Sequence, residues 1–307
     1  SAWPLGSSIT PDGVNFSIAA PHAKKVELLI FKTEDDHYPE ETISLDDKNR
    51  SGDYWHVEIE GLTEGTLYGY KVLIEEQKER EEQIVLDPCA RAIAGWKKYI
   101  RNKEVKTNKG YCHYLKGVVT KRDSFDFKSH PRPKHSWNQT IIYELHVGGF
   151  TKNSDTSINE TKKGTFIGLI EKIPYLKSIG ITSIELLPVF AFDSKDAPEG
   201  LVNYWGYSPI NWFTPHQDFV DCNNPLEARK QFKHFVEVCH DNGLEVFIDV
   251  VYNHTTEGNQ NGPKISWKNF GPNFYYHQDE NGSYQDVSGC GNSIAANRPL
   301  VRKLILE

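Results

Sequence analysis

Two short segments of this 307-residue chain carry side chains that could bind or transform a ligand. The first is DVVYNH at 249–254, in which an acid inside an expected strand precedes a histidine just beyond it. In parallel β/α barrels the active site is built at the carboxyl-terminal ends of the strands. Asp249 and His254 are therefore candidate site residues. Spacing alone favours a plainer alternative, in which Asp249 orients nearby backbone and His254 is an ordinary loop residue.

The second segment is NYWGYSP at 203–209, which places Trp205 and Tyr207 beside a glycine. Flat aromatic rings suit stacking on sugar faces, which present C–H groups to a ring. A packed aromatic loop is the alternative, and composition alone favours it. The segment lies in a long polar and aromatic insertion at 193–221, and long loops after strands commonly carry function.

The elements that must position these segments alternate along the second half of the chain. Apolar runs predict strands, and apolar residues at helical spacing predict helices between them. Pro174 lies inside the first helical pattern, where a proline kinks a helix. The expected order is strand 141–147, helix 165–178, strand 181–188, a helix beginning at Asn224 and ending at Gly243, and strand 244–251.

Such alternation predicts parallel strands with right-handed crossovers. Either an open doubly wound sheet or the start of an eight-stranded barrel fits it. No GxGxxG or GxxxxGK[ST] motif follows any of the strands, so a nucleotide-binding sheet is the less favoured of the two. No cofactor is expected.

Residues 3–114 show a different, two-residue period. Val14, Phe16 and Ile18 alternate with polar residues, and similar runs cover 26–30, 55–59 and 68–74. Turn-forming sequences separate these runs, which predicts an antiparallel β-sandwich. A basic, proline-containing stretch at 116–136 is expected to be a linker.

Composition narrows the class of partner. The net charge of −7 argues against nucleic acid, which calls for basic patches. No apolar run approaches the ~18 residues of a membrane helix, and no secretory signal is visible. Five cysteines without CxxC spacing indicate isolated thiols in a reducing compartment.

Taken together, several segments resemble one enzyme family. DVVYNH, NYWGYSP and IYELHVGGFT at 142–151 resemble strand ends of the α-amylase superfamily of glycoside hydrolases. HTTEGNQNGP at 254–263 and SGCGNSIAANRPLVRKLI at 288–305 are similar to isoamylase-type debranching enzymes. PLGSSITPDGVNFSIAAP at 4–21 and LDPCARAI at 86–93 resemble the carbohydrate-binding-type sandwich that precedes such barrels.

The resemblance implies hydrolysis of α-1,6 branch linkages in glycogen or amylopectin by a retaining mechanism with two carboxylates. In the family these follow the fourth and fifth barrel strands, so both are expected after Glu307 and no residue of this chain is assigned a catalytic role. Carried over by motif, Tyr207 stacks on the sugar next to the cleaved bond and His254 binds that sugar's hydroxyls. Asp249 orients neighbouring groups.

Three assignments that follow from the same resemblance are weaker. Asn253 is expected to fix its loop or, in some relatives, to help hold calcium, and no metal is assigned here. Trp205 contacts either glucan or core. In the sandwich Trp55 and Tyr54 are candidates for glucan contact, but Trp55 shares the parity of Val57, which favours the core.

The expected fold class is multi-domain: a carbohydrate-binding-like antiparallel β-sandwich followed by the first three β/α units of a truncated (β/α)8 barrel. The boundaries are 1–115 for the sandwich, 116–136 for the linker and 137–307 for the barrel part. Three strands leave an open edge, so we expect a longer natural product, a completing C-terminal segment or a homo-oligomer.

The expected partner is α-glucan polysaccharide, and the expected location is cytoplasmic, or the plastid stroma in a plant or alga. A second hypothesis is a non-catalytic glucan-binding or regulatory isoamylase-like subunit. The carboxylates expected after Glu307 would distinguish the two.

Overall fold

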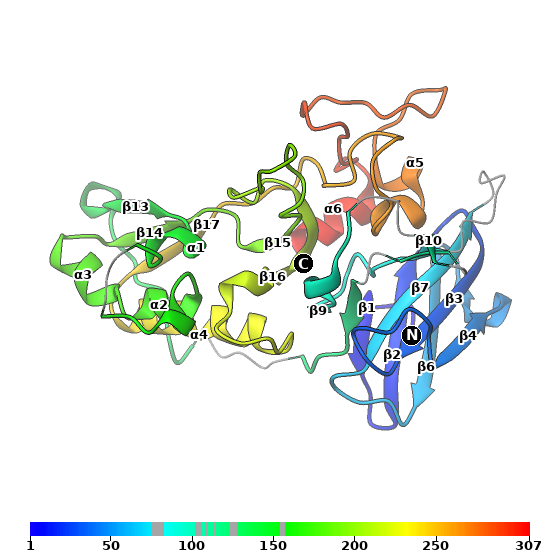
Figure 1. Ribbon diagram of the computed structural model, residues 1–307, viewed down its shortest axis with the longest axis horizontal. Helices are drawn as coiled ribbons and strands as arrows, with labels where there is room; N and C mark the ends of the chain where they lie inside the picture. Colours follow the sequence, from blue (N-terminus) through cyan, green and yellow to red (C-terminus); the bar gives the residue numbers. More distant parts are fainter. Residues whose placement is uncertain (75–82, 102–105, 108–109, 113–114, 123–127, 154–156) are drawn as a thin grey trace.

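The computed structural model describes residues 1–74, 83–101, 106–107, 110–112, 115–122, 128–153 and 157–307. A β-rich part formed by the early residues lies beside an α/β part formed by the later ones (Figure 1). No helix in these ranges is both long and apolar enough to cross a membrane.

Two antiparallel sheets make up most of the β-rich part. The first has the strand order β1-β2-β6-β5 and the second the order β4-β3-β7-β12-β9. The strands are β1 Gly6–Ile9, β2 Gly13–Ala19, β3 Ala23–Phe31, β4 Glu41–Leu45, β5 Arg50–Ser51, β6 Tyr54–Glu60, β7 Leu67–Ile74, β9 Ile93–Ala94 and β12 Lys116–Val118. A small third sheet joins β10 Lys106–Thr107, β11 Gly110–Cys112 and β8 Gln83–Ile84.

The two-residue alternation correctly predicted the four longest strands of the two larger sheets, β2, β3, β6 and β7. Trp55 on β6 is 3% exposed, and its Nε1 donates to the carbonyl of Ala20 (3.2 Å). The interpretation of Trp55 as a core residue is therefore confirmed. Strand β12 pairs with β7 and β9, so this sheet continues past the boundary predicted at residue 115.

One buried acid lies in the segment that follows β8. The Asp87 carboxylate is fully buried, and it accepts hydrogen bonds from the Tyr68 hydroxyl (2.8 Å) and the backbone N–H of Cys89 (2.7 Å). Burial raises the pKa of Asp87 from its ordinary 3.8 to about 6, although both hydrogen bonds oppose this change. The native protein therefore binds the Asp87 proton more tightly than the unfolded chain does.

Because of that difference, ionisation of Asp87 should lower the free energy of unfolding as the pH rises from about 4 to 7, by about 3 kcal/mol. Replacing Asp87 with asparagine keeps an acceptor for Cys89 and removes the charge. We expect the stability of Asp87→Asn, relative to wild type, to improve by about 3 kcal/mol over this range, measured by urea unfolding at several pH values. The exposed Asp12→Asn is the control. If the free energies of unfolding of Asp87→Asn and wild type differed by the same amount at every pH, the prediction would be contradicted.

The α/β part contains three parallel strands in the order β13-β14-β17, which are Ile142–Leu145, Ser183–Leu186 and Glu245–Ile248. Apolar side chains of the connecting helices pack against this sheet, including Phe166, Leu169 and Phe235. The helices are α1 Val147–Phe150, α2 Phe166–Ile170, α3 Ile173–Ser178, α4 Glu227–Asp241, α5 Pro272–Tyr275 and α6 Pro299–Leu306. The predicted strand–helix order is confirmed.

Two helix boundaries show the effect of local sequence. The helix predicted over 165–178 is broken into α2 and α3, and Pro174 occupies the first turn of α3. A proline suits that position because its missing N–H would have no intrahelical partner there. The α4 helix begins at Glu227, and the Asn224 side chain ahead of it accepts from the backbone N–H of Leu226 (3.1 Å).

The outer strands β13 and β17 are partly open: Ile142 is 45% and Ile248 39% exposed, because among the described residues each strand has only β14 as a neighbour. One expectation about these elements is wrong, because the insertion at 193–221 is not all loop. Strand β16, Pro209–Pro215, lies within it and pairs antiparallel with β15, Phe190–Phe192.

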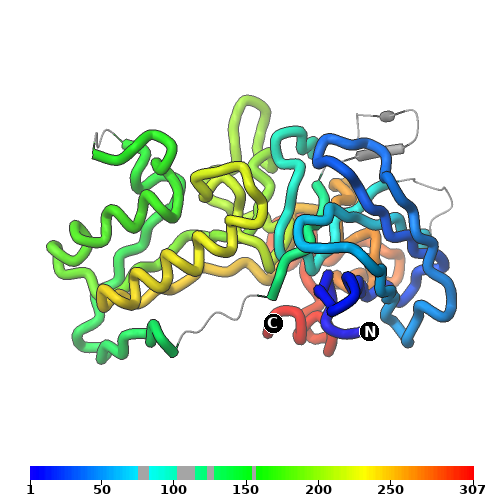
Figure 2. Tube along the Cα trace, turned by 90° about the horizontal axis from the view of Figure 1, so that it is seen from below, coloured from blue at the N-terminus to red at the C-terminus, as the bar shows by residue number. Residues whose placement is uncertain are grey.

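One hydrophobic cluster joins the β-rich part to later segments of the α/β part, while the parallel sheet has a core of its own. Trp267 and Phe270 belong to the same buried cluster as Phe16 and Tyr68, and the Tyr275 hydroxyl donates to the carbonyl of Ala19 (2.9 Å). Helix α6 lies against the N-terminal segment, where both chain ends lie on one side of the molecule (Figure 2). The orientation of the two parts is therefore held by buried contacts as well as by the connecting chain.

Candidate functional site

The carboxyl ends of β13, β14 and β17 form a common edge, which we call the rim. Leu145, Leu186 and Ile248 are aligned across the three strands. The backbone N–H of Asp249 then donates to the carbonyl of Leu186 (2.9 Å), so the pairing continues to the first residue after β17. This pairing fixes where the segment at 249–254 leaves the sheet.

Tyr207 and Asp249, two of the predicted site residues, meet at the rim. The Tyr207 hydroxyl donates a hydrogen bond to Oδ2 of Asp249, and the Tyr207 side chain is 41% exposed. Burial, this hydrogen bond and the nearby carboxylates of Glu144 and Glu185 raise the pKa of Tyr207. The hydroxyl therefore stays protonated and holds the ring in one orientation with part of its surface open.

His254 lies behind Tyr207 and is 5% exposed. Its Nε2 is 2.9 Å from the carbonyl oxygen of Tyr207, and its Nδ1 is 3.2 Å from Oδ1 of Asn253. Asn253 is exposed, and its own carbonyl accepts from the backbone N–H of Ile294 (2.9 Å). His254 thus supports the backbone of Tyr207, and both of its ring nitrogens face protein groups.

Trp205, the remaining predicted residue, is 57% exposed and meets the ring of Tyr204 edge to face (5.2 Å between centroids). Tyr204 itself stacks on His146, with centroids 4.1 Å apart, and the His146 Nε2 is 2.8 Å from the Tyr204 carbonyl oxygen. Burial lowers the pKa of His146. Tyr204, Trp205 and Tyr207, which we call the rim aromatic group, are held by protein contacts and are each more than 40% exposed.

A buried charged cluster anchors the loop that carries the rim aromatic group. Asp193, at the start of the loop, is fully buried and accepts from the Tyr99 hydroxyl (2.7 Å) and from Arg101. Arg101 also contacts Asp196 (2.6 Å) and donates to the carbonyl of Thr256 (3.0 Å). One guanidinium therefore joins the loop after β15 to the segment that follows His254.

A second buried acid, Glu257, organises the next segment. Its carboxylate is 1% exposed and accepts four hydrogen bonds, two at each oxygen. The donors are the backbone N–H groups of Ile265 (2.8 Å), Ser266 (2.7 Å) and Lys268 (3.0 Å) and the hydroxyl of Tyr276 (2.6 Å). These bonds close the loop 257–268, which begins three residues after His254.

Sequence reasoning missed the roles of His146, Tyr204, Arg101 and Asp193. The position of His146 directly after the first parallel strand was a usable signal, because that places it at the rim. No sequence signal connects Arg101 with Asp193, since they are 92 residues apart. Within the described ranges, no group of three or more His, Cys, Asp or Glu side chains is placed to hold a metal ion.

Gly206 allows the turn between Trp205 and Tyr207, because its φ of +83° lies in the left-handed region. A Cβ there would lie 3.1 Å from Cδ1 of Phe192 and 3.3 Å from the carbonyl oxygen of Pro188. We expect Gly206→Ala to lower the free energy of unfolding by about 1–2 kcal/mol from backbone strain, and by a further amount from these close contacts, measured by urea unfolding. Gly200→Ala is a matched control for the strain, because its φ is +81° but its Cβ would meet nothing within 4 Å. Equal losses of stability in the two variants would contradict a role for the contacts of Gly206 with Phe192 and Pro188.

Comparison with known proteins agrees with a two-part architecture. The model of the α-amylase catalytic domain matches residues 149–285, and that of carbohydrate-binding module 48 (isoamylase N-terminal domain) matches residues 4–90. The chain is 34% identical to isoamylase 3, chloroplastic, of Oryza sativa subsp. japonica, over 100% of this chain and 41% of that protein. This chain belongs to the isoamylase-type debranching enzymes.

This isoamylase-type chain is also 33% identical to the glycogen debranching enzyme of Enterobacter sp. (strain 638), over 97% of this chain and 46% of that protein. Its fold matches that of a pullulanase from Paenibacillus barengoltzii, solved in complex with maltohexaose and alpha-cyclodextrin. The TM-score is 0.77 over 100% of this chain and 46% of that one, at 24% identity, which shows a common fold. The chain spans less than half the length of these relatives.

Proposed function

We propose that the complete protein hydrolyses α-1,6 branch linkages of glycogen or amylopectin. The observation that carries this proposal is the rim aromatic group, in which Tyr207 is held by Asp249 with its ring partly open. Fixed, exposed rings at the carboxyl ends of parallel strands suit stacking against a glucosyl unit. Relatives named isoamylase and glycogen debranching enzyme support the choice of linkage.

Within this proposal, Tyr207 stacks on the glucosyl unit beside the scissile bond and Trp205 contacts the adjoining chain. Asp249 orients the Tyr207 hydroxyl, while Asn253 and His254 hold the backbone around it. A sugar hydroxyl would bind His254 only by displacing one of its two protein partners. The parallel strands β13, β14 and β17 are proposed to be the first three of an eight-stranded barrel.

The proposed chemistry is a retaining double displacement. One carboxylate attacks the anomeric carbon, and a second protonates the leaving oxygen and then activates water. Neither role is assigned to residues 1–307, and Asp249 is a supporting residue in this scheme. The proposed organisation is a sandwich that extends through β12 at 116–118, a linker from there to residue 136 and a barrel part at 137–307.

The proposed cellular compartment follows from the cysteines and from the names of the relatives. Four described cysteines, Cys89, Cys222, Cys239 and Cys290, are free thiols. Free thiols are typical of reducing compartments, and a plant relative is named chloroplastic. We therefore place the protein in a cytoplasm or a plastid stroma, with α-glucan as its partner.

The test is release of linear chains from amylopectin by the complete protein, with reducing ends labelled and resolved by length. We expect new short chains from amylopectin and no shortening of linear amylose, which lacks the branch linkages. Binding of amylopectin without release, by a folded complete protein, would contradict hydrolysis and identify a non-catalytic glucan-binding subunit. Shortening of amylose would contradict the proposed linkage.

A further inference from the structure

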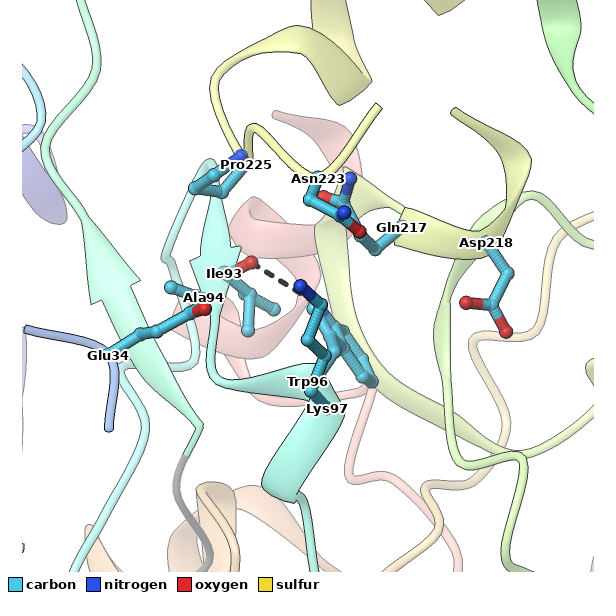
Figure 3. Close-up of a pocket in the computed structure, with 9 residues that line it drawn as sticks. All are labelled: Glu34, Ile93, Ala94, Trp96, Lys97, Gln217, Asp218, Asn223 and Pro225. Carbon is cyan, nitrogen blue, oxygen red and sulfur yellow. Dashed lines mark hydrogen bonds between the residues drawn. The ribbon is translucent and has the colours of Figure 1, made fainter. Parts of the chain in front are cut away.

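A cavity of about 130 Å³ lies between the β-rich and α/β parts and shares no lining residue with the rim aromatic group. One wall comes from Glu34, which follows β3, and from residues 93–97. The opposite wall comes from residues 217–225, which lead into α4. Figure 3 shows these side chains arranged around the opening, with Trp96 of the first wall near the centre of the view. Neither part would form this cavity alone.

The polar groups of the cavity retain hydrogen-bonding capacity. The Asn223 amide has no hydrogen-bond partner in the described part of the chain. Gln217 uses its Nε2 to donate to the carbonyl of Cys222 (2.8 Å), which leaves Oε1 available. Among the described residues, the Glu34 carboxylate accepts from the backbone N–H of Gly95 (3.2 Å) through Oε2. The cavity therefore offers donors and acceptors together, as vicinal hydroxyl groups require.

Trp96 gives the cavity a fixed aromatic surface. Its Nε1 donates to the carbonyl of Ile93 (3.1 Å), and its ring packs edge to face with His216 (5.0 Å) and Tyr99 (6.2 Å between centroids). The ring is half-buried and lines the cavity. A rigid ring among polar groups is suited to a ligand with both C–H faces and hydroxyl edges.

The charges around the cavity narrow the ligand class. The charged lining residues are two carboxylates, Glu34 and Asp218, and one ammonium group, that of Lys97. This balance disfavours a phosphate or another anion and is compatible with a neutral polyol. We infer that the cavity binds one glucosyl unit of an α-glucan chain, as a second subsite separate from the rim. The choice of α-glucan rests on the function proposed above.

The test is titration of the complete protein with maltoheptaose, a linear probe without branch linkages, followed by calorimetry. The variants are made in a protein that already carries Tyr207→Ala. This substitution weakens maltoheptaose binding at the rim, so the binding that remains is attributed to the cavity. In that background we expect Trp96→Ala to raise the dissociation constant about tenfold or more, a change equivalent to about 1.4 kcal/mol. The double variant Gln217→Ala/Asn223→Ala, which changes two surface side chains, should raise it severalfold.

Matched controls are Trp137→Ala, which removes a tryptophan that is 82% exposed and does not line the cavity, and the exposed Gln260→Ala. Both should bind maltoheptaose as the Tyr207→Ala background does. Loss of all binding in that background, or equal affinity with and without the cavity substitutions, would overturn the inference. Where Trp96→Ala does not fold, the double variant decides.

Failure of this inference is distinct from failure of the proposed function. Amylopectin debranching is measured separately on the wild-type protein. Normal debranching with no binding at the cavity would reject the second subsite alone. Cavity binding in a protein that releases no chains would reject hydrolysis and keep the subsite.

Discussion

Replacing Glu257 with alanine is expected to lower the free energy of unfolding by about 4 kcal/mol or more. The carboxylate accepts four hydrogen bonds in a buried setting, and each hydrogen bond to a charged group contributes about 1.5–3 kcal/mol. Alanine leaves these four donors without an acceptor and opens a small cavity. Urea unfolding of Glu257→Ala and of the wild-type protein measures the difference in the free energy of unfolding.

Glutamine at position 257 should have an intermediate effect. Its carbonyl oxygen can still accept from Ile265 and Ser266, but its amide group then faces the backbone N–H of Lys268, which is also a donor. The control is Glu280→Ala, a substitution of the same type in an exposed turn, which should change stability by less than about 0.5 kcal/mol. Equal midpoints for Glu257→Ala and Glu280→Ala would refute a structural role for the buried carboxylate.

The strands that could be predicted from the sequence are those whose alternation of apolar and polar residues follows the way they pack in the folded protein. Strands β2, β3, β6 and β7 show two-residue alternation because alternate residues of each strand, such as Val14, Phe16 and Ile18 of β2, belong to one shared core. Strand β16 was missed because apolar and polar residues do not alternate regularly in its sequence PINWFTP, and prolines at both ends argue against a strand. The exposure of Ile142 and Ile248 depends on which strands are neighbours, which periodicity does not encode.

The candidate site divides in the same way. Tyr207, Asp249 and His254 lie in short motifs at strand ends, so local sequence was enough to select them. Their contacts were not predictable, because the Tyr207–Asp249 hydrogen bond joins residues 42 positions apart. The loop is anchored by Arg101, which lies in the part of the chain that precedes the first parallel strand. Such partners are selected by the folded topology and carry no local pattern.

The anchoring cluster also fixes the two segments that meet at the rim. Asp193 is fixed by Tyr99 and Arg101, and the same guanidinium holds Thr256, two residues after His254. The loop carrying Tyr207 and the segment carrying His254 are therefore positioned by one group. If the rim binds a sugar chain as proposed, a rim fixed in this way loses less conformational entropy on binding than a mobile loop would.

We expect Tyr207→Ala to lower kcat/KM of the complete protein on amylopectin by about 10²–10³-fold, a loss of about 2.7–4 kcal/mol. The substitution removes the proposed stacking surface and leaves the Asp249 carboxylate without its hydroxyl donor. Tyr207→Phe keeps the ring and removes only the hydrogen bond, so its loss should stay within about tenfold. Initial rates of reducing-end release at several amylopectin concentrations separate kcat from KM.

The raised pKa of Tyr207 also gives a prediction for the pH dependence of the reaction. Burial and the nearby carboxylates raise the pKa of Tyr207, so its hydroxyl does not ionise below the ordinary range of tyrosine. Tyr207→Phe should therefore leave the alkaline side of the rate profile unchanged. Tyr38→Ala, at a tyrosine that is 50% exposed in the β-rich part, is the matched control and should retain wild-type kcat/KM. If Tyr207→Phe lost as much activity as Tyr207→Ala, the hydroxyl bonded to Asp249, and not the ring face, would be the group that the reaction requires.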